Sequence, residues 1–182
     1  MRKALYVMGI LNDSDVEWLA SNGRRSAIAK GQVLIREGHP VDAMFIVLDG
    51  GLDVTVGGKW VATLLAGEIL GEISFVDSRP PSATVAASRS SMVLAIGREK
   101  LNARLNSDLG FASRFFRALA TFLADRLRMT TARLGYGSAA QDAEQSGDPD
   151  EIAFDMMDSA SLAAVRFDRL LKRLGESPGA AN

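Results

Sequence analysis

The sequence contains no cysteine. This absence excludes a disulfide framework and thiolate metal sites, and it fits a reducing compartment. Histidine is nearly as scarce, since His39 is the only one, and it lies in a predicted turn beside Pro40 with no motif around it. No pair of acidic residues falls in a recognisable catalytic context. We therefore expect no enzyme activity and no bound metal.

An excess of charge and long apolar runs are also missing. The 21 Lys and Arg residues nearly balance the 22 Asp and Glu residues, so no overall positive charge favours nucleic acid. No apolar run approaches the roughly 18 residues that a transmembrane helix needs. Residues 1–15 begin with basic residues, but their apolar stretch is brief and Gly9 breaks it. No small-residue cleavage site follows, so we interpret them as mature protein rather than a signal peptide. These features predict a cytoplasmic protein that binds neither nucleic acid nor membrane.

Short apolar runs bounded by Gly, Pro or Asp dominate the first half of the chain. Residues 11–20 have the spacing and the first-turn acids of a helix, which Gly23 ends. From residue 25 onward the pattern changes to seven or eight short runs. Such closely spaced strands predict a sandwich or jelly-roll barrel rather than alternating strands and helices. The clearest runs are 33–35, 43–48, 52–56, 60–65, 85–87 and 92–96.

Helical spacing returns after residue 98. A short helix over 98–105 precedes a long one over about 107–134, in which apolar residues recur every three or four positions. A helix of this length exceeds what a small barrel can cover, so we expect a homodimer through residues 112–134. The arginines of this helix lie mostly off its apolar stripe: Arg114, Arg117, Arg126, Arg128 and Arg133.

The last part of the chain changes in composition. We interpret residues 136–158 as an acidic, flexible linker, because seven of them from Asp142 to Asp158 are acids uninterrupted by Lys or Arg. Residues 159–182 then predict an amphipathic helix and tail with a basic face. This helix suits packing on the dimer or on a protein partner, and attachment to a membrane surface is the less common alternative. Residues 1–135 would form the preceding domain.

Residues 70–85, LGEISFVDSRPPSATV, are the most informative stretch. They predict a short strand ending at Gly71, one turn of helix, a tight Pro-Pro turn and a β-branched strand. A glycine followed by an acid, a helical turn and small hydroxyl residues can direct several backbone N–H groups toward one point. Such a concavity suits a cluster of anionic oxygens.

This stretch, with EGHPVDAMFIVLDG at 37–50 and LLAGEILGE at 64–72, resembles the cyclic-nucleotide-binding domain family. That family includes the catabolite activator protein and the kinase regulatory subunits. The resemblance covers residues 11–134 and implies a mostly β fold with flanking helices. It would be a double-stranded β-helix, or jelly-roll, barrel with an N-terminal helix and a long C-terminal dimerisation helix. It also implies a regulatory module that senses cyclic AMP or cyclic GMP and signals through the long helix and the C-terminal tail. Too few residues follow Leu134 for a helix-turn-helix DNA-binding domain.

The resemblance also implies roles for individual residues. Gly71 would allow close approach of the backbone, and Glu72 would accept a hydrogen bond from the ribose 2′-OH. In DRLRMTTARL, at 125–134, a hydroxyl pair would meet the adenine amino group, although threonine hydroxyls near a helix end also bond to the preceding turn. Without the resemblance, Glu72 could equally be a solvated acid. The full set of implied ligand-binding residues is Gly71, Glu72, Ile73, Ser74, Arg79, Ser82, Ala83, Thr130 and Thr131.

One position departs from the family pattern. Pro81 stands where the family places its phosphate-binding arginine, and proline offers neither charge nor backbone N–H. Losing a charged partner to a buried phosphate costs roughly 2–5 kcal/mol. Arg79 could replace that arginine, or it could be a solvated turn residue. The alternative to a cyclic-nucleotide sensor is therefore a degenerate fold that serves as a scaffold through 112–134 and 162–174, or that senses another ligand.

Overall fold

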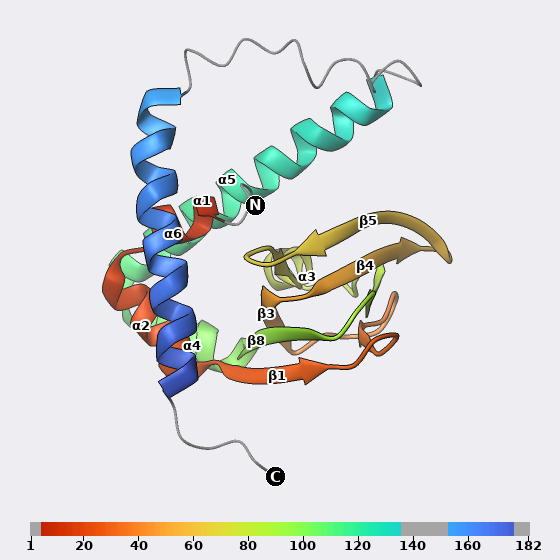
Figure 1. Cartoon of the computed structure of the whole chain (residues 1–182), viewed down its shortest axis with the longest axis horizontal. Helices are drawn as coiled ribbons and strands as arrows, with labels where there is room; N and C mark the ends of the chain where they lie inside the picture. Colours follow the sequence, from red (N-terminus) through yellow and green to blue (C-terminus); the bar gives the residue numbers. More distant parts are fainter. Residues whose placement is uncertain (1–4, 136–152, 177–182) are drawn as a thin grey trace.

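The computed structural model describes residues 5–135 and 153–176. A β-barrel lies on one side of the molecule, and a group of helices lies on the other (Figure 1). Within the described ranges, no helix is long and apolar enough to cross a membrane.

The barrel consists of two four-stranded antiparallel sheets. One sheet has the order β1-β8-β3-β6 and the other the order β2-β7-β4-β5. Apolar side chains from both sheets fill the space between them, including the fully buried Val47, Leu52 and Val93. The predicted jelly-roll class is confirmed. The strands of the described chain are β1 (Arg24–Ile28), β2 (Val33–Ile35), β3 (Ala43–Asp49), β4 (Gly51–Val56), β5 (Lys59–Leu65), β6 (Ile69–Leu70), β7 (Thr84–Ala87) and β8 (Ser91–Gly97).

Two helices precede the barrel, α1 (Leu5–Ile10) and α2 (Asp13–Asn22). A reciprocal capping box starts α2 at Asn12. The Asp15 N–H donates to Asn12 Oδ1, and the Asn12 N–H donates to Asp15 Oδ2, each at 2.9 Å. Both bonds satisfy backbone donors that the first turn of a helix leaves unpaired.

After the barrel come α4 (Arg98–Ser107) and the long α5 (Leu109–Gly135). Asp108 separates them with extended backbone, and its Oδ1 accepts a hydrogen bond from the Phe111 N–H at 2.9 Å. This is an N-cap interaction, so the predicted break and the long helix are both found.

One face of α5 is part of the core between the helices and the barrel. Phe111, Phe115 and Phe122 are buried, and Phe111 lies 5.6 Å from the ring of Trp18 in α2. The opposite face remains exposed within the described chain, at Leu109, Phe116 and Leu127. The helix therefore has two apolar faces, of which the chain covers one.

The last helix, α6, runs from Ala153 to Glu176 and lies across α1 and α2 (Figure 1). The prediction that the linker extends to Asp158 is therefore wrong, because the helix begins before Ser159. Acids such as Asp155 suggested a linker, but acids in a first helical turn favour the helix dipole. Residues 136–152 of the predicted linker lie outside the described residues.

Candidate ligand-binding pocket

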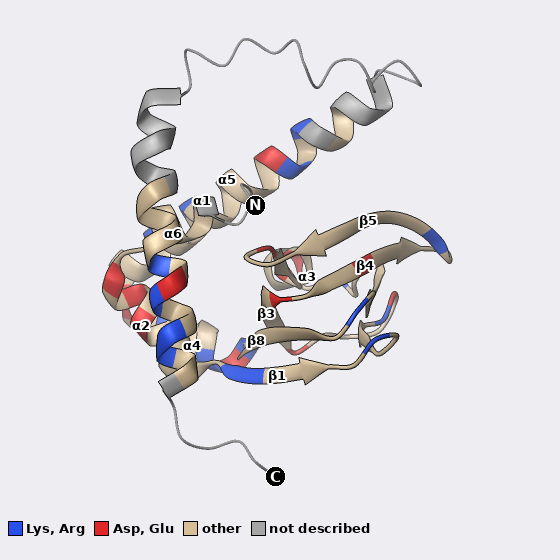
Figure 2. Ribbon diagram, in the orientation of Figure 1, with Lys and Arg blue, Asp and Glu red and all other residues tan. Residues whose placement is uncertain are grey.

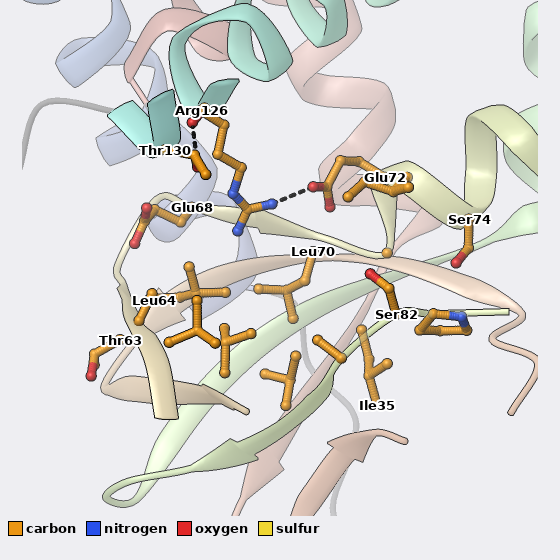
Figure 3. Close-up of a pocket in the computed structure, with 18 of the residues that line it drawn as sticks. Ile35, Thr63, Leu64, Glu68, Leu70, Glu72, Ser74, Ser82, Arg126 and Thr130 are labelled. Atoms are coloured by element: carbon orange, nitrogen blue, oxygen red, sulfur yellow. Dashed lines mark hydrogen bonds and ion pairs between the residues drawn. The ribbon is translucent and has the colours of Figure 1, made fainter. Parts of the chain in front are cut away.

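A cavity of about 470 Å³ opens between the barrel, the short helix α3 (Glu72–Asp77) and α5. Its floor is apolar, with side chains such as Ile35, Leu64 and Leu70 from several strands (Figure 3). Polar groups converge at one end from α3 and α5. An apolar cavity with few convergent polar groups has the usual build of a small-molecule site.

Gly71 sets the geometry where β6 leads into α3. Its φ of 80° lies in the left-handed region, and a Cβ there would lie 2.8 Å from the Ala43 carbonyl oxygen of β3. Glycine alone avoids both the backbone strain and the clash. The sequence prediction of close backbone approach therefore matches the structure, although the neighbour is β3 of the same chain.

Glu72 is the first residue of α3 and is only 2% exposed. Its carboxylate forms an ion pair with the guanidinium of Arg126, which reaches it from α5 (Figure 3). Burial raises the pKa of the Glu72 carboxyl above its ordinary value, and the charge of Arg126 offsets this only partly. Glu72 is therefore a buried, hydrogen-bonded acid at the cavity wall, and not a solvated acid at a strand end.

Arg126 is the main site residue that the sequence analysis missed. Its guanidinium also lies 5.2 Å from the centre of the Phe122 ring, and its side chain is 34% exposed. Among the described residues that line the cavity, it carries the only positive charge. A signal was available, because Arg126 precedes Thr130 by one helical turn and so shares its face.

The segment after α3 also reaches the cavity. Pro81, Ser82 and Ala83 line it, and the Pro81 carbonyl accepts a hydrogen bond from the Gly38 N–H at 2.9 Å. The backbone at Pro81 thus ties this segment to the turn at Gly38. Ile73 and Ser74 of α3 line the cavity as well.

Arg79 lies elsewhere. Its side chain is 84% exposed, its backbone N–H donates to Asp77 Oδ1 at 3.0 Å, and it does not line the cavity. The structure thus matches the solvated-turn interpretation of Arg79.

The two threonines of α5 differ. Thr130 lines the cavity, and its Oγ1 donates to the Arg126 carbonyl oxygen at 2.9 Å. Thr131 is exposed and is not among the lining residues. Only one of the two predicted base contacts therefore belongs to the cavity of this chain.

An aromatic side chain stands in the wall that β5 contributes. Trp60 lines the cavity and is 63% exposed. The other tryptophan, Trp18, is half-buried in the helical core. Trp60 thus offers an apolar ring at the edge of the site.

Residues 25–108 match the family model of the cyclic nucleotide-binding domain. This segment is a cyclic nucleotide-binding domain. The match covers the barrel, the stretch 70–85 and α4, so the predicted resemblance to the cyclic-nucleotide-binding domain family is confirmed. Glu72 and Arg126 thus face a cavity in a domain of the type that holds cyclic nucleotides in other proteins.

Individual proteins agree with this assignment. The chain is 33% identical over 72 residues to a cGMP-dependent protein kinase of Toxoplasma gondii, a match covering 40% of this chain and 7% of the kinase. The N-terminal domain of a transcriptional regulator from Streptomyces coelicolor A3(2) is 28% identical, with a TM-score of 0.56, over 70% of this chain and 91% of that domain. The catabolite activator protein of Thermus thermophilus shares the fold at 23% identity and a TM-score of 0.59, over 91% and 84% of the two chains.

The chain spans only a small part of the curated kinase that it matches. The matched region spans less than a tenth of the Toxoplasma gondii kinase, so the activity of that whole protein does not carry over. Within the described ranges, no group of three or more His, Asp or Glu residues could hold a metal ion.

Proposed function

We propose that this chain is a regulatory module that binds a cyclic nucleotide, cyclic AMP or cyclic GMP, in the cavity below α5. The observation that carries the proposal is the pair of Glu72 and Arg126 at the cavity wall. A buried carboxylate accepts hydrogen bonds strongly, as a ribose hydroxyl requires. A guanidinium beside it suits the negative charge of a cyclic phosphate.

The pair also suggests how binding would reach the rest of the molecule. Glu72 belongs to α3 and Arg126 to α5, so a ligand that bonds to either residue changes the link between these helices. A ligand shifts such an equilibrium only through different affinities for its two states. In this proposal, α5 is the element that responds, and the C-terminal tail follows it.

The exposed face of α5 would pair with a second copy of the chain. Leu109, Phe116 and Leu127 are exposed there, and apolar or small residues recur along this face at alternating four- and three-residue spacing. That spacing is typical of a two-stranded coiled coil. The positions are Leu109, Ser113, Phe116, Ala120, Leu123, Leu127 and Thr130.

Calorimetric titration with cyclic AMP and cyclic GMP tests the ligand. We expect binding by the full chain, and a loss of about tenfold or more in Glu72→Gln, because a hydrogen bond to a charged group contributes roughly 1.5–3 kcal/mol. Arg126→Gln should also weaken binding. Arg79→Ala is the matched control and should bind unchanged, since Arg79 lies outside the cavity.

One observation favours a second candidate, a scaffold whose cavity takes no cyclic nucleotide. Among the lining residues that the structure describes, Glu68, Glu72 and Asp125 stand against one cation, Arg126, and Pro81 supplies no charge. This balance opposes an anionic ligand. Absence of heat with both nucleotides, in a protein that remains folded, would reject the cyclic-nucleotide sensor in favour of a scaffold or of a site for another ligand.

A further inference from the structure

Helix α6 is held by contacts with the N-terminal part of the chain. Acidic residues of α2 lie beside basic residues of α6 (Figure 2), and ion pairs join the two helices. Ala163 and Leu170 of α6 are fully buried, and Leu174 is 8% exposed. We call the surface that receives this helix the α1–α2 face, defined by Met8, Gly9, Asp13 and Glu17.

Arg166 makes the most specific of these contacts. Its Nε donates to Asp13 Oδ1 at 2.8 Å, and its Nη1 donates to the carbonyl oxygens of Met8 and Gly9 at 3.2 and 3.0 Å. Those carbonyls belong to the last turn of α1, where helix carbonyls lack intrahelical partners. With its side chain 13% exposed, Arg166 links α1, α2 and α6.

Two further arginines extend the contact along α6. Arg169 Nη1 lies 2.5 Å from Asp13 Oδ2, and Arg173 Nε lies 2.7 Å from Glu17 Oε1. These pairs are about half-exposed, so they contribute modestly and are weakened by salt. The α1–α2 face therefore recognises a helix that presents arginines at Arg166, Arg169 and Arg173, and its outer ion pairs can open and re-form.

The segment that joins α5 to α6 is long enough for the α1–α2 face to receive α6 of its own chain or α6 of another copy. Residues 136–152 join the end of α5 to the start of α6, and a segment of that length spans up to roughly 55 Å when extended. The free energy of loop closure changes slowly with loop length. The same contacts are therefore available to α6 of a neighbouring copy.

We propose that the α1–α2 face is an exchangeable docking site that takes α6 of a second copy of this chain. The exposed, regularly spaced face of α5 supports a second copy as the occupant, because pairing of two α5 helices brings two α6 helices and two docking faces into one assembly. Exchange of an identical element is a low-cost route to a dimer. The proposal goes beyond ligand binding and does not require the cavity to be filled.

The absence of cysteine makes a direct test simple, because every thiol in a variant is an introduced one. Full-length Asp13→Cys and full-length Arg169→Cys are mixed, unfolded and refolded together, then treated with a short bis-maleimide. Exchange predicts a covalent heterodimer on a denaturing gel, with the two cysteine peptides joined in its mass spectrum. The pair Glu17→Cys and Arg173→Cys repeats the test one helical turn away, in case loss of the Asp13 contacts disturbs docking.

Two controls make every result decisive. Lys59→Cys, at the exposed tip of the β4–β5 hairpin, mixed with Arg169→Cys measures random collision, and it should give no heterodimer. The double variant Asp13→Cys/Arg169→Cys measures docking within one chain. Internal crosslinks in the double variant with none in either mixture would overturn the exchange, as would equal crosslinking in the Lys59→Cys control. Absence of crosslinks in every sample would overturn the docking contact itself, and the exchange with it.

Discussion

Glu72 places a titratable carboxyl where burial opposes its ionisation. Its pKa is raised because the carboxyl is 2% exposed, although Arg126 lies beside it. A carboxyl that is harder to ionise in the folded state binds more protons there than in the unfolded state. The free energy of unfolding therefore falls as the pH rises through the interval above the ordinary glutamate pKa.

This gives a prediction for Glu72→Gln, which cannot titrate. The unfolding free energy of the wild-type chain should fall relative to that of the variant as the pH rises from about 4.5 toward 7. Urea denaturation of both proteins across this range measures the difference. A difference that stays constant with pH would show that Glu72 has the same pKa in both states.

The sequence predicted some residues of the site and missed others. Glu72 and Gly71 were singled out because the contiguous stretch 70–85 resembles the motif of a known family. Arg126 was not, because its partner lies 54 positions away and only folding brings α5 over α3. Arg79 was proposed for its nearness in sequence, and its side chain points to solvent instead.

At the scale of elements, α2 and α5 are joined by a two-point ion pair. Arg114 Nε and Nη2 donate to the two carboxylate oxygens of Asp15 at 2.6 and 2.9 Å. Burial alone would raise the pKa of Asp15, but hydrogen bonds from Arg114 and from the Asn12 N–H lower it below its ordinary value. Asp15 therefore serves the α2 capping box and the contact with α5 together.

We expect Asp15→Ala to lower the free energy of unfolding by about 2–4 kcal/mol. This loss of stability is smaller than the loss expected for breaking a fully buried ion pair, because the Arg114 side chain is one-third exposed. A double-mutant cycle with Arg114→Ala, followed by urea denaturation, isolates the pair. Arg117→Ala, on an exposed part of the same helix, should change little. Additive effects of Asp15→Ala and Arg114→Ala would contradict the coupling.

The helices and strands that the sequence predicted correctly are those whose boundaries depend on neighbouring residues. The helix over 11–20, the long helix that follows residue 106 and the short bounded strands are predicted from neighbouring residues, and the structure contains them. The start of α6 was missed because acids at a helix start have the composition of an acidic linker. Its docking on α1 and α2 depends on contacts between residues more than 150 positions apart, which no local pattern encodes.

At the scale of the whole molecule, the second apolar face of α5 determines the predicted assembly. Leu127 is 67% exposed, so Leu127→Glu should cost the isolated chain little stability while placing a charge in the proposed dimer seam. We expect a shift from dimer to monomer, measured by light scattering after size-exclusion chromatography. Arg128→Glu changes a neighbouring exposed position outside the seam and should leave the dimer intact. A wild-type chain that is monomeric at all concentrations would refute the dimer.

The position of Trp60 gives the molecule an optical signal of its own. Its exposed ring stands in the cavity wall, whereas Trp18 is half-buried in the helical core and does not line the cavity. A ligand that covers Trp60 would replace water around the indole and shift its emission to shorter wavelength. In a Trp18→Phe chain, all tryptophan emission would come from the pocket, so unlabelled protein would report occupancy in real time, and an unchanged spectrum at saturation would place the ligand away from β5.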